Sequence, residues 1–143
     1  MIRTATPDDI PDIVTIENTC FDSDRLSLRA LRYMVHNAQV RFLVYTLRGK
    51  VVGYIITQCH QRSRLARHYS LAVLPDFRKR GVAEQLLRAT EKACAHKEGY
   101  RLELRADNRA AQKLYQRLGY EVTGMREAYY ADGEDAVQMV KWR

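Results

Sequence analysis

The chain has 143 residues, of which 46% are hydrophobic and 29% charged, and this composition is typical of one globular domain rather than of a disordered segment. No stretch approaches the roughly 20 apolar residues that span a bilayer, and the N-terminus lacks an apolar leader. We therefore expect a soluble, untargeted domain over residues 1–143 without membrane contact. The net charge of +7 favours anionic partners, and charge alone leaves both nucleic acid and a phosphorylated cofactor open.

The first half of the chain has the pattern of a strand, two helices and a hairpin. Thr6 and Pro7 are a cap and a first helical residue, and Ser27 is the cap of the next helix. Gly49 supplies the left-handed turn between two β-rich runs. The expected elements are a strand at Ile2–Ala5, a helix reaching about Asn18, a helix after Ser27, and strands at Val40–Leu47 and Val51–Cys59.

The second half alternates strands with helices and ends in a second hairpin. Apolar residues recur every three or four positions from Gly81 to about Lys97, where Gly99 is the expected end signal. Asp107 or Asn108 caps a later helix that Gly119 closes. The other expected elements are strands at Arg67–Leu74 and Arg101–Arg105 and a hairpin of Tyr120–Tyr130 with Asp135–Lys141, turning at Asp132-Gly133. This order predicts a mixed α/β sheet with a β-α-β-α centre.

The cysteines and histidines give no sign of a metal site. Cys20, Cys59 and Cys94 are odd in number and widely spaced, without a Cys-x-x-Cys pair, which fits a reducing, cytoplasmic environment best. The four histidines lack zinc-ligand spacing, so we expect no metal.

The junction after the strand at Leu71–Val73 has the features of a phosphate site. A basic loop, Arg78–Arg80, leads into a helix that begins at Gly81. The first turn of a helix has unpaired N–H groups and a partial positive charge, which together bind phosphate. Neither a Walker pattern nor G-x-G-x-x-G is present. Taken alone, Arg78-x-x-Gly81-x-Ala83 favours a basic surface loop before an ordinary helix over a phosphate site.

The next strand and helix make the pattern specific. Asn108, Ala111, Leu114, Tyr115, Gly119 and Tyr120 follow Leu102–Asp107, and Tyr129-Tyr130 precede Asp132–Ala136. With the Arg78–Ala83 motif, these residues resemble the GNAT superfamily of N-acetyltransferases over roughly residues 40 to 140. They are most similar to the bacterial ribosomal-protein N-terminal alanine acetyltransferases. The resemblance implies a central mixed, twisted β-sheet flanked by about four α-helices.

The resemblance also implies acetyl-CoA as co-substrate and a set of residues that bind it. The strand at Leu71–Val73 would splay from its neighbour, so that its free backbone groups pair with the pantetheine arm. The N–H groups from Arg78 to Ala83 would hold the diphosphate. The implied cofactor-binding residues are Leu71, Ala72, Val73, Arg78, Lys79, Arg80, Gly81, Val82, Ala83 and Asn108.

For the reaction, the resemblance implies that an amine attacks the acetyl carbonyl directly. Glu103 would take up the proton of the amine, and Tyr115 would protonate the departing thiolate. Tyr69, Tyr129 and Tyr130 would line the acceptor site. Each residue also has an ordinary structural interpretation: Glu103 as a solvent-facing strand residue, the tyrosines as packing residues and Asn108 as a helix cap.

The acceptor class favoured by the resemblance is the α-amine of a protein or peptide N-terminus. A lysine side chain or a small-molecule amine is the alternative, and the acceptor loop at Phe21–Leu26 lacks the tryptophan-containing segment of the ribosomal-protein enzymes. A non-catalytic acetyl-CoA sensor and a basic RNA-binding module are rivals from other classes. We expect a monomer or homodimer that does not bind nucleic acid.

Overall fold

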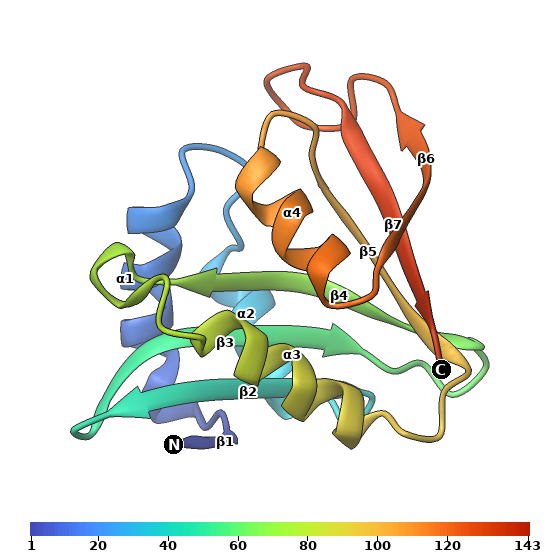
Figure 1. The fold of residues 1–143 in the computed structure, drawn as a ribbon. Helices are drawn as coiled ribbons and strands as arrows, with labels where there is room; N and C mark the ends of the chain where they lie inside the picture. Colours follow the sequence, from blue (N-terminus) through green and yellow to red (C-terminus); the bar gives the residue numbers. More distant parts are fainter.

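One continuous seven-stranded sheet runs through the molecule in a computed structural model that describes residues 1–143 (Figure 1). The strand order is β1-β2-β3-β4-β5-β7-β6, and every neighbouring pair is antiparallel except β4 and β5, which are parallel. The strands are β1 (Ile2–Thr4), β2 (Val40–Leu47), β3 (Lys50–Gln58), β4 (Leu65–Val73), β5 (Gly99–Arg105), β6 (Glu121–Arg126) and β7 (Ala136–Trp142).

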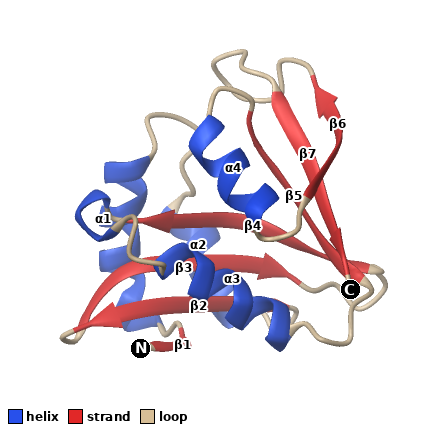
Figure 2. Ribbon diagram, viewed as in Figure 1, coloured by secondary structure: helices blue, strands red, loops and turns tan.

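Four α-helices cover the two faces of the sheet (Figure 2). The predicted mixed α/β fold with about four helices is therefore confirmed. None of the helices is long and apolar enough to cross a bilayer. The helices are α1 (Ile10–Cys20), α2 (Leu28–His36), α3 (Val82–Ala93) and α4 (Arg109–Arg117), with short 3₁₀ helices η1 (Pro7–Asp9) and η2 (Pro75–Phe77).

Each face of the sheet has its own apolar core. On one face, Ile13 and Ile16 of α1 and Leu31 of α2 pack on β2, β3 and the end of β4. On the other face, Leu86 and Leu87 of α3 lie in a core that also includes residues of β5, β7 and α4. In Figure 1, α3 and α4 accordingly lie in front of the sheet and α1 and α2 behind it. The centre of the sheet is thus buried on both sides, which rigidly supports the loops at its edges.

The helix caps that were read from the sequence are present. The Oγ of Ser27 accepts a hydrogen bond from the Ala30 N–H at 3.0 Å and starts α2. The Oδ1 of Asn108 accepts from the Ala111 N–H at 3.1 Å and starts α4. Both are N-cap contacts that satisfy an otherwise unpaired donor of the first turn.

The predicted end of the central helix was wrong. Helix α3 ends at Ala93 instead of about Lys97, and Gly99 belongs to β5. A Cβ atom on Gly99 would lie 2.5 Å from the Lys141 carbonyl oxygen, so this glycine serves the close approach of β7 rather than a helix end.

The last hairpin is also looser than predicted. Strand β6 ends at Arg126 and β7 begins at Ala136, so the connection is a long loop and not a tight turn at Asp132-Gly133. Ala128 has a φ of 48°, a left-handed conformation that interrupts the strand. As a result, Tyr129 and Tyr130 lie in a loop rather than within a strand.

A β-bulge divides β4 into two parts. Ile56 of β3 pairs with Ser70 and Thr57 pairs with His68, so Tyr69 has no partner. Such an extra residue reverses the alternation of side chains along a strand. His68 consequently packs among the aromatic rings of the α3 and α4 core, whereas Ala72 lies in the α1 and α2 core.

The structure pairs two of the three cysteines, which the sequence analysis did not predict. Cys59, just after β3, and Cys94, at the end of α3, form a disulfide and are both buried, and Cys20 is the free cysteine. Their spacing of 35 residues gave no signal, because the contact depends on how α3 lies across the sheet.

Candidate functional site

Strands β4 and β5 pair only at their beginnings and then diverge. The parallel register runs from Leu65 opposite Gly99 to His68 opposite Leu102 and stops there. In Figure 1 the two strands start together at the lower right and separate, β4 to the left and β5 upward. Leu74 donates its N–H to Val52 of β3, so alternation directs the backbone groups of Leu71 and Val73 away from β3 and into the opening.

The turn before α3 carries a row of free backbone donors. The N–H groups from Lys79 to Glu84 make no hydrogen bond within the chain. Lys79 and Gly81 both have left-handed backbone conformations, with φ of 62° and 80°. A Cβ atom on Gly81 would meet nothing closer than the Gln85 side chain at 3.6 Å, so the space in front of the turn is open. Free N–H groups at the positive end of a helix dipole are suited to bind a diphosphate.

The side chain of Arg78 turns back toward β4 instead of toward this turn. Its Nε donates to the Val73 carbonyl at 2.9 Å and its Nη2 contacts the Cys20 Sγ at 3.4 Å. The loop is thereby fixed to the end of β4, and the Val73 carbonyl is already bonded within the chain. A ligand that pairs with β4 in the way of an added strand would therefore bond to the Val73 N–H and to the backbone N–H and carbonyl of Leu71. The backbone groups of Ala72 face β3 instead.

Tyr115 of α4 lies in the core on the α3 and α4 side of the sheet, and its hydroxyl is unused. The residue is only 8% exposed, and its ring packs edge-on against Tyr120 with centroids 5.7 Å apart. Burial raises the pKa of Tyr115 above its usual value, so the phenol keeps its proton at neutral pH. Packing thus fixes the ring, while the hydroxyl makes no hydrogen bond within the chain.

Glu103 is held between two arginines. Its Oε2 accepts from the Arg67 Nε and its Oε1 from the Arg101 Nη1, both at 3.1 Å. The Arg67 guanidinium also donates to the Tyr129 hydroxyl at 3.2 Å and lies 5.3 Å from the centroid of the Tyr69 ring. A single arginine therefore brings together Glu103, Tyr69 and Tyr129.

Tyr130 lies beside this group in the β6–β7 loop. Its ring is edge-on to Tyr129 at 5.1 Å, and the Arg105 guanidinium lies 5.1 Å from its centroid. Burial, with smaller contributions from Tyr129 and Glu103, raises the pKa of Tyr130 to about 12. Of the five acceptor and proton-transfer residues expected from the sequence, Tyr69, Glu103 and Tyr129 thus contact Arg67, and Tyr130 contacts Tyr129.

Two loops that are far apart in sequence meet next to these tyrosines. The Asp24 carboxylate, in the α1–α2 loop, accepts from the Ala131 N–H of the β6–β7 loop at 3.2 Å and 3.3 Å. Asp24 has a left-handed φ of 55°. Arg105 binds Asp132 at 2.6 Å and so holds the same β6–β7 loop from the other side.

A buried carboxylate lies behind the end of β4. Glu17 of α1 is 2% exposed and contacts the hydroxyl of Tyr54, which is also 2.9 Å from the Ser70 Oγ. Glu17 also accepts from the Leu26 N–H at 3.1 Å and so shapes the α1–α2 loop. The Glu17 carboxylate is thus used to hold the loop.

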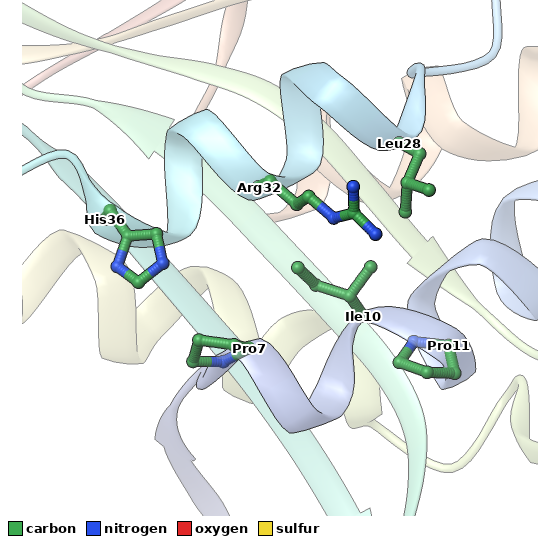
Figure 3. Close-up of a pocket in the computed structure, with 6 residues that line it drawn as sticks. All are labelled: Pro7, Ile10, Pro11, Leu28, Arg32 and His36. Atoms are coloured by element: carbon green, nitrogen blue, oxygen red, sulfur yellow. The ribbon is translucent and has the colours of Figure 1, made fainter.

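A cavity of about 630 Å³ lies elsewhere in the molecule. It is formed between η1, the start of α1 and α2, as Figure 3 shows, and none of the residues described above lines it. Arg32 and His36 reach toward it from α2. Its lining residues are Pro7, Ile10, Pro11, Leu28, Arg32 and His36.

The family follows from a match over nearly the whole chain. Residues 3–142 match the acetyltransferase (GNAT) domain. The chain belongs to the GNAT acetyltransferase family. Among its relatives, the NAA10 catalytic subunit of the N-terminal acetyltransferase A complex of Arabidopsis thaliana is 33% identical over 98% of this chain and 76% of that protein. An N-alpha-acetyltransferase of Saccharolobus solfataricus is 30% identical over 98% of this chain and 91% of that protein.

Solved GNAT structures agree with this assignment. The ribosomal-protein-S18-alanine N-acetyltransferase of Escherichia coli superimposes with a TM-score of 0.87 at 28% identity, over 99% of this chain and 92% of that one. Ard1 of Thermoplasma volcanium has a TM-score of 0.90 at 31% identity, over 99% and 96%. This GNAT chain is thus similar both to the ribosomal-protein enzyme and to the Ard1 type.

Sequence reasoning about this GNAT chain missed three contributors to the site. Arg67 was predicted only as the first residue of a strand, although its alternation with Tyr69 on that strand could have linked the two. Glu17 follows Ile10 and Ile13 at helical spacing, which was a signal for a buried carboxylate. The contact between Asp24 and Ala131 left no signal in the sequence, because it joins residues 107 positions apart.

Proposed function

We propose that residues 1–143 form one acetyltransferase domain that transfers the acetyl group of acetyl-CoA to the α-amine of a protein or peptide N-terminus. The observation that carries the proposal is the row of free N–H groups from Lys79 to Glu84, next to the opening between β4 and β5. The relatives named for N-terminal acetylation support the acceptor class.

In this proposal, the cradle before α3 holds the diphosphate of acetyl-CoA. The backbone N–H groups of the residues after Arg78 point toward the ligand, and Gly81 leaves room for it. Leu71 and Val73 bind the pantetheine arm as an added strand. The side-chain carbonyl of Asn108 caps α4, and its amide nitrogen remains free to contact the same arm. Two residues expected from the sequence do not fit this role, because Ala72 pairs toward β3 and the Arg78 N–H donates to the Pro75 carbonyl. The proposed set is Leu71, Val73, Lys79, Arg80, Gly81, Val82, Ala83 and Asn108.

Tyr115 is the proposed general acid. Acetyl-CoA supplies a thioester whose carbonyl an amine can attack and whose sulfur leaves as a thiolate. Tyr115 keeps its proton at neutral pH, holds its ring rigidly against Tyr120 and donates that proton at its free hydroxyl.

Glu103 is the proposed proton acceptor, acting through a water molecule. Each of its oxygens accepts from one arginine, and a carboxylate has about four lone-pair sites, so acceptor capacity remains. Only a modest base is needed for an N-terminal amine, because its pKa is about 7.7–8.0, whereas that of lysine is about 10.4. This difference is why an N-terminus is preferred over a lysine side chain.

The other classes of function have less support. In an RNA-binding module the basic residues would be free for phosphates, yet Arg64 binds Glu98 and Arg78 binds the Val73 carbonyl. A non-catalytic acetyl-CoA sensor would not need the free hydroxyl of Tyr115. We also propose that the protein is cytoplasmic and either monomeric or homodimeric. In the reducing environment of the cytoplasm, the disulfide of Cys59 and Cys94 is converted into two buried thiols.

The test combines binding with turnover. Calorimetry measures the affinity for acetyl-CoA and for a short RNA, and a thiol-release assay measures turnover with N-terminal peptides, a peptide with a blocked N-terminus and an internal lysine, and free polyamines. The proposal expects acetyl-CoA binding and thiol release only with free N-termini. Binding without thiol release would favour the sensor, and turnover with the blocked peptide would favour a lysine acceptor.

A further inference from the structure

Two arginines form the outer side of the central cluster of the acceptor site. Of the three charged side chains in the central cluster, Glu103 is the innermost, with 9% of its side chain exposed, whereas Arg67 is 25% and Arg101 44% exposed. Two guanidinium groups cover one carboxylate, so the cluster has an excess positive charge on its outer side.

The other acids near this cluster have partners elsewhere. Asp107 and Asp132 are both paired with Arg105, and Asp24 binds the Ala131 N–H. Glu103 is therefore the only carboxylate in an ion pair with Arg67 or Arg101.

Arg67 also has unused hydrogen-bond donors. A guanidinium has five N–H donors in a fixed fork. Within the chain, Nε donates to Glu103 and Nη2 donates once to Tyr129, so both N–H groups of Nη1 and one of Nη2 are free. Such a fork binds a carboxylate with two parallel hydrogen bonds.

The cluster lies where the acceptor must pass. Arg67 and Glu103 each adjoin the last paired residues of β4 and β5, His68 and Leu102, after which the strands diverge. The cluster is thus at the base of the opening, and the rings of Tyr69 and Tyr129 flank it. An acceptor whose amine enters the opening brings its next residues within reach of both arginines.

We propose that Arg67 and Arg101 select acceptors with a carboxylate side chain at the second or third position, where the residue that carries the reacting amine is the first. This inference rests on the proposed function and narrows its substrate class to acidic N-termini. A cationic group placed next to these two guanidinium groups is disfavoured, since like charges repel at short range.

The experiment uses six-residue peptides with an N-terminal alanine and either Glu, Gln or Lys at both the second and third positions. Turnover gives kcat and KM for each peptide. Fluorescence anisotropy of C-terminally labelled peptides gives their Kd for the CoA-saturated protein, which does not depend on catalysis. We expect KM and Kd about tenfold lower for the Glu peptide than for the Gln peptide, the size of one charge-assisted hydrogen bond, with the Lys peptide weakest and kcat similar. In 1 M salt the preference shrinks, because exposed charges are screened.

Variants separate recognition from mere structural support. Arg67→Gln and Arg101→Gln should reduce the Glu-to-Gln preference, and Arg67→Lys should keep part of it. The matched control is Arg62→Gln, an exposed arginine in the β3–β4 turn that makes no hydrogen bond or ion pair within the chain, and it should keep the full preference. If Arg67→Gln weakens binding of the Glu and Gln peptides equally, so that the preference stays intact, Arg67 is a structural residue only and the inference is overturned.

The two proposals fail in different ways. If the wild-type protein acetylates Glu and Gln peptides equally, the inference is overturned and N-terminal acetylation stands. If no peptide is acetylated but the Glu peptide binds about tenfold more tightly, charge recognition stands and the proposed function does not.

Discussion

The Nε2 of His68 lies 2.7 Å from the hydroxyl of Tyr120, inside the core between the sheet and α3. Tyr120 donates its proton to Glu91 at 2.7 Å, so His68 must donate to Tyr120 from Nε2. The other ring nitrogen, Nδ1, then accepts from the Thr57 hydroxyl at 2.9 Å. These contacts fix the histidine as the neutral Nε2–H tautomer, with a defined role for each nitrogen.

This arrangement makes stability depend on pH. Burial lowers the pKa of His68 from 6.5 to about 3, with Lys141 contributing in the same direction. Between these values the unfolded chain binds one more proton than the folded one, so the free energy of unfolding falls as pH falls from about 6.5 toward 3. One such group contributes up to ~1.4 kcal/mol per pH unit.

The measurement is urea unfolding of the wild type and His68→Gln from pH 4.5 to 7.5. The variant cannot titrate at this position, so its free energy of unfolding should depend less steeply on pH. His36→Gln, which changes an exposed histidine, is the control and should follow the wild type. Parallel curves for all three proteins would show that His68 is not the group responsible.

Tyr115→Phe should slow turnover and leave cofactor binding unchanged. The substitution removes only the hydroxyl, which makes no hydrogen bond within the chain, so the packing against Tyr120 is kept. Loss of a general acid typically lowers kcat by about 10²–10⁴. Thiol release gives kcat and calorimetry gives the Kd of acetyl-CoA. Tyr33→Phe, at an exposed tyrosine of α2, is the control, and full turnover in Tyr115→Phe would remove this residue from the chemistry.

Gly81→Glu should weaken acetyl-CoA binding by tenfold or more, on the order of 1.4 kcal/mol. The new side chain forces a left-handed φ of 80° on a residue with a Cβ atom and places a negative charge in front of the free N–H groups. Gly49→Glu has a similar φ of 77° in the β2–β3 turn, and its Cβ atom meets nothing, so it reproduces the backbone strain alone. Equal affinities of the two variants in calorimetry would disprove the cradle.

Reduction of the disulfide should lower stability by about 3–4 kcal/mol in the chain-entropy treatment of a loop of this length. The bond closes a segment of 35 residues between the end of β3 and the end of α3. Urea unfolding with and without dithiothreitol measures this change in the free energy of unfolding, and the change should vanish in Cys94→Ala. Cys20→Ser alters the free thiol and is the control, in which the change should be preserved. A dithiothreitol effect that persists in Cys94→Ala would point to another cause.

The sequence was most informative where structure is local. The caps at Ser27 and Asn108 and the glycine turn at Gly49 depend on neighbouring residues alone, and all three were predicted. The start of α3 at Gly81 was also predicted, whereas its end was misplaced because Gly99 serves the packing of β7.

Long-range contacts escaped prediction for a common physical reason. The position of Arg67 beside Glu103 depends on the parallel register of β4 and β5, and that register is set by packing of the whole sheet. The pairing of Cys59 with Cys94 depends in the same way on where α3 crosses the strands. Patterns of spacing describe one element at a time and so hold no information on these distances.

The bond between Asp24 and the Ala131 N–H has a practical consequence for engineering. Neither loop can be exchanged for that of a relative by itself, since a new α1–α2 loop without an acceptor at this position leaves Ala131 unanchored, and a new β6–β7 loop displaces the donor. Grafting a foreign substrate preference onto this scaffold therefore requires transplanting both segments from one donor protein.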